Sequence, residues 1–167
     1  MTALVLAAAK TLAFEPLEHR ELLPGEVRIR TLLSGISAGT ELSQYRGTSP
    51  FMSRQWDERL RLFRPSDTPS WTYPVRNLGY EEVGEIVETG RDVTALKIGD
   101  RVFGTWGHRT EHVWAATDAA QRRMPDGADP RIGIFSHIGA VALNGVPDAH
   151  IRMGDLVVVF GRGVPGQ

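Results

Sequence analysis

Gly79-Tyr80-Glu81-Glu82-Val83-Gly84-Glu85-Ile86-Val87 predicts a β-strand from its fourth residue onward, because apolar side chains alternate there with charged ones. Gly84 lies inside this strand, which indicates a bulge or a close approach of another backbone segment. Similar short runs, separated by turns rich in Gly, Pro and Asp, occur at residues 3–7, 27–31, 101–103, 111–116 and 121–124. Many short strands of this kind favour a mainly β fold with some helix, built as a small barrel.

Two segments are predicted to be helices. In residues 53–63, three apolar residues recur at helical spacing. They are Trp56, Leu60 and Phe63. The second helix has Asp129 as its N-cap and Pro130 at its first position. We expect it to end near residues 144–145, because Pro147 cannot donate to the helical hydrogen-bond ladder.

The architecture is expected to change near the C-terminus. Residues 156–160 form a continuous apolar run, typical of a strand buried on both faces of a parallel sheet. Gly161, Gly163 and Gly166 follow it in a G-x-G-x-x-G pattern, in which glycines allow a tight turn and the approach of a pyrophosphate. The alternative is a glycine-rich tail. Without the helix that completes the pattern, we expect this chain alone to bind a dinucleotide poorly.

The composition of the 167 residues excludes several functions. The 19 basic and 20 acidic residues nearly cancel, and the densest basic run, residues 54–64, is interrupted by acidic and apolar side chains, which argues against nucleic-acid binding. No apolar run has the length of a membrane span and no signal peptide begins the sequence, so a cytoplasmic location is expected. The absence of cysteine excludes disulfides and thiolate metal sites. A small molecule is the expected partner.

Five motifs occur in series along the chain. They are Pro24-Gly25-Glu26-Val27, Ser34-Gly35-Ile36-Ser37-Ala38-Gly39-Thr40-Glu41, the Gly79–Val87 stretch quoted above, Ile98-Gly99-Asp100-Arg101-Val102, and Val158-Val159-Phe160-Gly161. In this order they resemble the medium-chain dehydrogenase/reductase superfamily, also called zinc-type alcohol dehydrogenase-like. Its catalytic domain is a GroES-like barrel, and the resemblance covers nearly the whole chain.

The resemblance implies the domain organisation and the reaction. It implies a GroES-like, partly open barrel over residues 1–128, a connecting helix over 129–150, and the first strand of a truncated Rossmann α/β domain over 151–167. It further implies an oxidoreductase that uses NAD or NADP and acts on an alcohol/ketone or a conjugated carbonyl. The cofactor would require the remainder of the Rossmann domain, through which members often form homodimers. The chain alone is therefore expected to be inactive.

Departures from the family pattern indicate a zinc-free branch. Zinc-dependent members have a catalytic cysteine where this chain has Ser37-Ala38 and a metal-binding histidine where it has Tyr80, and they commonly place a cysteine or acidic ligand near Ser136. The four-cysteine structural lobe is also missing. We therefore expect no catalytic zinc, and another hydrogen-bond donor or general acid must act on the substrate oxygen.

Four residues are predicted to be catalytic. Tyr80 stands at the histidine position and has a phenol that can donate a proton; the alternative is a tyrosine packed in the core. Thr40 matches the family's proton-passing hydroxyl, or is an ordinary turn residue. Glu81 matches the last position of the family's Gly-His-Glu pattern, or pairs with an arginine within the barrel. His108 follows the Gly-Asp-Arg-Val turn on a loop beside the expected substrate cleft, or is a surface histidine.

Further residues are assigned to the substrate pocket. Ser37 and His137 lie at or next to the family's metal-ligand positions, and Trp56 belongs to a segment dense in aromatic residues. Packing within the fold is the alternative for each of them, and His112 is expected to be structural. A metal held by Glu81, His108 and His137 is a minor alternative, because these residues have no recognised ligand spacing.

Two other functions remain open at this point. One is a zinc-dependent alcohol or polyol dehydrogenase with atypical ligands. The other is a stand-alone GroES-like module for binding or assembly. The sequence does not identify the substrate, and it does not distinguish NAD from NADP.

Overall fold

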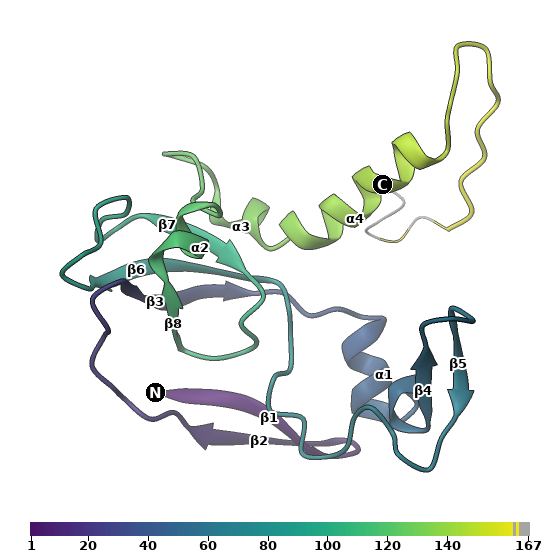
Figure 1. Cartoon of the computed structure of the whole chain (residues 1–167), viewed down its shortest axis with the longest axis horizontal. Helices are drawn as coiled ribbons and strands as arrows, with labels where there is room; N and C mark the ends of the chain where they lie inside the picture. The colour runs from purple at the N-terminus through teal and green to yellow at the C-terminus, as the bar shows by residue number, and fades with distance from the viewer. Residues whose placement is uncertain (162, 164–167) are drawn as a thin grey trace.

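A four-stranded antiparallel sheet forms the centre of the fold in the computed structural model, which describes residues 1–161 and residue 163 (Figure 1). Its strand order is β7-β6-β3-β8. The strands are β3 (Glu26–Ser34), β6 (Glu82–Thr89), β7 (Arg101–Gly104) and β8 (Glu111–Ala115). Each of these strands was expected from its pattern of apolar residues. Helix α2 (Ala116–Ala120) follows β8 directly and was not expected.

A hairpin of β1 (Thr2–Ala8) and β2 (Thr11–Pro16) lies on the opposite side of the sheet from the C-terminal helices (Figure 1). Single bridges connect it to the rest of the chain, Ala3 with Arg109 and Leu6 with Val75. Because these are isolated bridges and not continuous ladders, the sheets do not close into a complete barrel. The mainly β, partly open barrel expected from the sequence is therefore confirmed.

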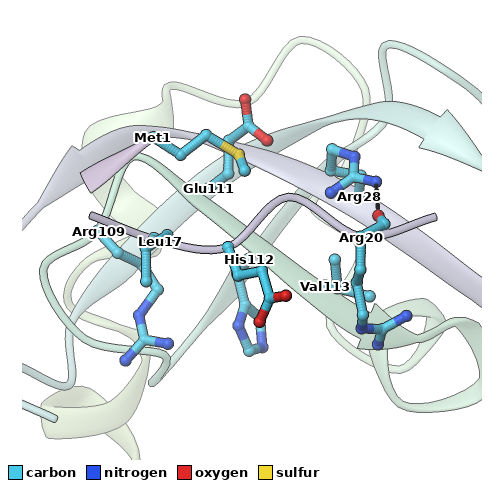
Figure 2. A pocket seen from close by; sticks show the side chains of 9 residues that line it. Met1, Leu17, Arg20, Arg28, Arg109, Glu111, His112 and Val113 are labelled. Atoms are coloured by element: carbon cyan, nitrogen blue, oxygen red, sulfur yellow. Dashed lines mark hydrogen bonds between the residues drawn. The ribbon is translucent and has the colours of Figure 1, made fainter. Parts of the chain in front are cut away.

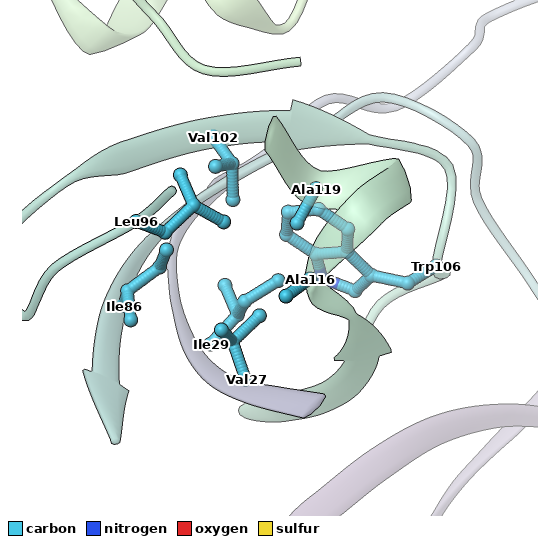
Figure 3. Close-up of a cluster of buried hydrophobic side chains, with 8 residues drawn as sticks. All are labelled: Val27, Ile29, Ile86, Leu96, Val102, Trp106, Ala116 and Ala119. Carbon is cyan, nitrogen blue, oxygen red and sulfur yellow. The ribbon is translucent and has the colours of Figure 1, made fainter. Parts of the chain in front are cut away.

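The core lies between the central sheet, α2 and the loops that cross them (Figure 3). It consists of Val27, Ile29, Ile86, Leu96, Val102, Trp106, Ala116 and Ala119. The strand residues among them alternate with outward-facing ones, as the period of a β-strand requires. At Gly84, a Cβ atom would lie 2.3 Å from Ile29 Cγ2 and 2.8 Å from the Arg30 carbonyl oxygen. The close backbone approach expected at this glycine is thus confirmed.

The helix predicted over residues 53–63 is wrong. The segment forms a 3-10 turn, η1 (Pro50–Met52), and a hairpin of β4 (Arg54–Asp57) with β5 (Leu62–Pro65). Trp56 and Phe63 are directly opposite in this hairpin, with ring centroids 5.1 Å apart. Two residues seven positions apart share a helix face, but they also face each other across a short hairpin, so the spacing alone was ambiguous. The strand predicted at 121–124 is also wrong, because the segment makes only the bridge between Val102 and Arg123.

The connecting helix is divided in two. The Asp129 side chain accepts a hydrogen bond from Arg131 N at 2.9 Å, which confirms the predicted N-cap, and α3 (Pro130–Gly133) follows. After a break, α4 (Ser136–Asp148) continues through the expected end at residues 144–145. Pro147 lies in its last turn, where losing one ladder hydrogen bond does not stop the helix. No helix in the described part of the chain is long and apolar enough to cross a membrane.

The strand predicted at residues 156–160 is not formed in the structure. Leu156 and Phe160 are 92 % and 93 % exposed, and the described residues provide no strand that pairs with this run. A strand of a parallel sheet needs such neighbours for its backbone hydrogen bonds. Gly161 has a φ of 88°, in the left-handed region that suits the first glycine of the nucleotide pattern. The backbone bends at Gly163, and Gly166 lies outside the described residues.

Candidate functional site

Three predicted site residues form a cluster of hydroxyl groups, Ser37, Thr40 and Tyr80, called the hydroxyl cluster below. The Tyr80 hydroxyl donates to Ser37 Oγ at 2.6 Å and lies 3.4 Å from Thr40 Oγ1. Ser37 lies in the loop after β3, Thr40 begins helix α1 (Thr40–Arg46), and Tyr80 lies two residues before β6. These positions meet because the end of β3 pairs with the start of β6.

His137 joins the hydroxyl cluster from the first turn of α4. Its ring makes an edge contact with the Tyr80 ring, with centroids 5.3 Å apart and an interplanar angle of 70°. The side chain of His137 is exposed, whereas Tyr80 is half-buried. Four residues predicted from three separate parts of the sequence are therefore neighbours in the structure.

His108 lies deeper, in the loop between β7 and β8. Its Nε2 atom is 2.7 Å from Glu41 Oε2, its Nδ1 atom contacts Ser34 Oγ, and its side chain is 10 % exposed. The hydrogen bond with Glu41 raises the pKa of His108, against the effect of burial, and the negative charges of Glu41, Glu82 and Glu81 add to the rise. Both ring nitrogens of His108 thus have protein partners.

Two adjacent glutamates at the start of β6 differ in environment. Glu82 is completely buried and accepts a hydrogen bond from Ser34 Oγ at 3.2 Å, while its Oε2 atom has no partner. Burial raises the pKa of Glu82. The Glu81 side chain packs so closely on Gly35 that a Cβ there would lie 2.5 Å from Glu81 Oε2. Burial is the largest cause of the raised pKa of Glu81, followed by the negative charge of Glu41.

Trp56 is separated from the other predicted site residues. It lies on the β4–β5 hairpin, is 42 % exposed and packs edge-on against Phe63. None of the contacts found in the described residues joins it to the hydroxyl cluster. Its assignment to the substrate pocket stays a prediction.

The donor atoms at the cluster do not suit zinc. Ser37 and Tyr80 present neutral hydroxyls that hydrogen-bond to each other, whereas protein zinc sites use thiolate, imidazole or carboxylate ligands. Within the described residues, no three His, Asp or Glu side chains are grouped closely enough to hold a metal ion. The residues at the hydroxyl cluster therefore do not fit a zinc ion.

A cavity of about 380 Å³ lies elsewhere, between the chain start, the segment before β3 and strand β8 (Figure 2). It contains none of the predicted site residues. Arg28 lines this cavity, but its guanidinium already donates hydrogen bonds to Glu88 Oε2 at 2.6 Å and to the Arg20 carbonyl oxygen at 2.6 Å. His112 lies here and stacks on Trp106 with centroids 5.6 Å apart, in agreement with the structural role expected for it.

Glu41, Ser34 and Glu82 were not singled out as site residues by sequence reasoning. Glu41 is 5 % exposed, and its carboxylate hydrogen-bonds both to the backbone N–H of Ser37 and to the ring of His108. The alternation of side chains along β6 gave one signal that Glu82 is buried, because residue 82 lies on the same face of the strand as the buried Ile86. Nothing in the sequence indicated that His108 would be the partner of Glu41, since 66 residues lie between them.

Comparison with known proteins identifies the class to which this fold and site belong. The family model of the alcohol dehydrogenase GroES-like domain matches residues 23–142. The chain belongs to this family, the GroES-like catalytic domain of the medium-chain dehydrogenases.

Individual relatives are dehydrogenases of this class. The D-guloside 3-dehydrogenases of Shigella flexneri and Escherichia coli (strain K12) are each 36 % identical over 172 residues, which cover 100 % of this chain and 49 % of theirs. The crystal structure of 2R,3R-butanediol dehydrogenase from Bacillus subtilis superposes with a TM-score of 0.68 at 26 % identity, covering 99 % of this chain and 52 % of that one. The chain thus spans about half the length of the relatives it matches.

Proposed function

We propose that this chain is the catalytic-domain portion of an NAD(P)-dependent oxidoreductase that acts on an alcohol/ketone or a conjugated carbonyl without catalytic zinc. The observation that carries the proposal is the hydroxyl cluster, in which Tyr80 is within 2.6 Å of Ser37 Oγ and 3.4 Å of Thr40 Oγ1. By the motif resemblance, Ser37 and Tyr80 stand at positions where zinc-dependent members have metal-binding residues, and Thr40 matches the family's proton-passing hydroxyl. An oxidoreductase on alcohols is also what the named relatives suggest, since they are dehydrogenases of a guloside and of a butanediol.

The cluster can perform the proton transfer that accompanies hydride transfer. A carbonyl oxygen that receives a hydride on its carbon must be polarised and then protonated, and a hydroxyl donor in a fixed position does both. A phenol is in general more acidic than an aliphatic hydroxyl, so Tyr80 is the proton donor among the three. Ser37 and Thr40, within reach of the Tyr80 oxygen, orient it and stabilise the negative charge left when its proton moves to the substrate. The reverse reaction uses the same groups to accept the proton of an alcohol.

The nicotinamide cofactor would supply or accept the hydride. Among the residues described here, Gly161 has the left-handed backbone that the start of a nucleotide-binding turn needs. Gly163 and Gly166 complete the pattern in the sequence. NAD and NADP are equally compatible with these residues.

The test is steady-state kinetics of the full-length protein with NAD, NADP and a panel of sugars, diols and ketones. Tyr80→Phe removes only the phenol oxygen, so we expect kcat to fall at least 100-fold while KM changes less than threefold, because the lost interaction develops in the transition state. Tyr45→Phe, which removes a phenol from the other end of α1, is the matched control and should keep wild-type kcat. Wild-type kcat in Tyr80→Phe, or activity that disappears with chelation of zinc and returns with its addition, would contradict the proposal.

A further inference from the structure

We propose that Glu41 and His108 form a buried ion pair that positions the hydroxyl cluster, and that His108 acts through this pair and not as a proton donor to substrate. The proposal rests on the proposed function, because it concerns the same site. Both residues are positioning residues in this account.

Glu41 connects the loop that carries Ser37 to the loop that carries His108. Its Oε1 atom accepts the backbone N–H of Ser37 at 2.9 Å, and its Oε2 atom lies 2.7 Å from His108 Nε2. The side chains of Glu41 and His108 are 6 % and 10 % exposed, so water competes little for these bonds. One carboxylate thus fixes the backbone next to the hydroxyl that receives the Tyr80 hydrogen bond.

The hydrogen-bond partners around the ring favour a doubly protonated His108. With Glu82 ionised, the Ser34 hydroxyl donates to Glu82 Oε1 at 3.2 Å and accepts from His108 Nδ1. At Nε2, the Glu41 carboxylate can only accept. In this arrangement both nitrogens carry protons, and the pair is an imidazolium with a carboxylate, which agrees with the rise that Glu41 causes in the pKa of His108.

Charged groups from each neighbouring element agree with this assignment. Glu41 faces the ring from α1, and Glu81 and Glu82 face it from the start of β6. The adjacent Arg109 guanidinium donates instead to Asn77 Oδ1 at 3.0 Å. Three carboxyl groups near one imidazole favour its charged form.

The ring also supports the segment that carries Tyr80. Gly79 has a φ of 96°, and a Cβ atom there would lie 2.7 Å from His108 Cε1, so the ring packs directly on this glycine. The His108 backbone N–H donates to the Leu78 carbonyl oxygen at 2.7 Å. The two partners of the shortest bond in the hydroxyl cluster are therefore held through one pair of side chains: Ser37 by Glu41, and the segment before Tyr80 by His108.

This arrangement leaves His108 without a free nitrogen for substrate. A proton donor to substrate must reach the reacting oxygen directly or through one water. Both nitrogens of His108 are occupied, and the ring is nearly covered. Its effect on the reaction must therefore pass through the geometry of Ser37 and Tyr80, where an error of about 1 Å can reduce the rate on the order of 100-fold.

The test uses the full-length protein with Glu41→Gln, Glu41→Ala and His108→Gln, and with His19→Gln at an exposed histidine as the control. Two measurements need no substrate: hydrogen exchange of the Ser37 amide, and titration of the His108 ring by NMR. A glutamine at position 41 can still accept the Ser37 N–H but carries no charge. Glu41→Gln should therefore lower the pKa of His108 while Ser37 keeps its protection, whereas Glu41→Ala should also speed exchange of the Ser37 amide at least tenfold.

Kinetics then connect the pair to the reaction. We expect Glu41→Ala and His108→Gln to lower kcat at least tenfold with KM within threefold. In Glu41→Gln, the alkaline limb of the kcat profile should move to lower pH by the same amount as the pKa of the His108 ring. The proposal is overturned if Ser37 exchange in Glu41→Ala equals that of the wild type, or if His108→Gln keeps the wild-type kcat and pH profile. Failure of the proposed function appears separately, as wild-type kcat in Tyr80→Phe.

Discussion

His108 and His112 lie four residues apart but have opposite titration behaviour. The hydrogen bond to Glu41 raises the pKa of His108. Burial against Trp106 and Trp114, aided by the positive charge of Arg109, lowers the pKa of His112 to about 4. Burial by itself disfavours the charged form of histidine, so the presence of a carboxylate partner decides the sign.

His112 should make the fold sensitive to acid. Its pKa in the folded protein is depressed to about 4, so its contribution to stability is complete above the unfolded value near 6.5 and is lost as the pH falls toward 4. Between pH 7 and pH 5, the wild type should therefore lose roughly 1 to 2 kcal/mol more of its unfolding free energy than His112→Phe does. Urea denaturation at both pH values measures this. His19→Phe should keep the wild-type dependence, and an unchanged dependence in His112→Phe would show that His112 is not the sensitive group.

At the scale of elements, the loops that carry Ser37 and His108 are held in position by contacts with other elements, such as Glu41 of α1. The β4–β5 hairpin packs instead on aromatic residues close to it in sequence: Phe51 of η1 makes an edge contact with Phe63 at 4.8 Å and stacks on Trp71 at 4.7 Å. This cluster is local, and η1 is the only helical or strand element with which β4 shares several contacts besides β5, within the described residues. Changes in the hairpin should therefore have limited effects on global stability.

Two tryptophan substitutions compare the contributions of the hairpin and of the core to global stability. Trp56 is 42 % exposed, and Trp56→Ala should lower the free energy of unfolding by only about 0.5 to 1.5 kcal/mol. Trp106 is 4 % exposed within the core, and Trp106→Ala should cost about 3 to 5 kcal/mol. Chemical denaturation followed by circular dichroism compares them. Equal losses in the two variants would show that the hairpin is part of the cooperative core.

At the scale of the whole molecule, the partly open barrel brings together segments that are far apart in sequence. The β1–β2 hairpin is attached by isolated bridges, yet Leu6 is completely buried and exchanges backbone hydrogen bonds with Val75 at 3.1 and 2.9 Å. Buried apolar surface, more than ladder length, must therefore hold this hairpin to the remainder of the domain.

A matched pair within the hairpin tests this attachment. Leu6 and Leu12 face each other in the β1–β2 ladder, but Leu6 is 0 % exposed and Leu12 is 50 % exposed. Leu6→Ala should lower the free energy of unfolding by about 2 to 5 kcal/mol, while Leu12→Ala should change it by less than about 1 kcal/mol. Both variants should unfold in a single transition, as measured by urea denaturation. A separate early transition in Leu6→Ala would mean that the hairpin unfolds independently.

The sequence by itself determined the class of this protein and most of its strands. Alternation of apolar residues located β3, β6, β7 and β8, and serial motifs led to the family, because strand period and turn residues are local properties. Local pattern was insufficient at residues 53–63, where one spacing suits both a helix and a hairpin, and at residues 156–160, where a strand requires partners.

Only the tertiary structure decided how the site is assembled. Thr40 and Tyr80 were recognisable from their motifs, but Glu41 and His108 acquire their roles from a contact of 2.7 Å that no local pattern encodes. The pairing of β3 with β6 and the path of the β7–β8 loop create this contact. The hydrogen bond to Glu41, which outweighs the effect of burial, favours the charged form of His108. In our proposal this pair holds the hydroxyl cluster in place, and His108 does not itself act on the substrate.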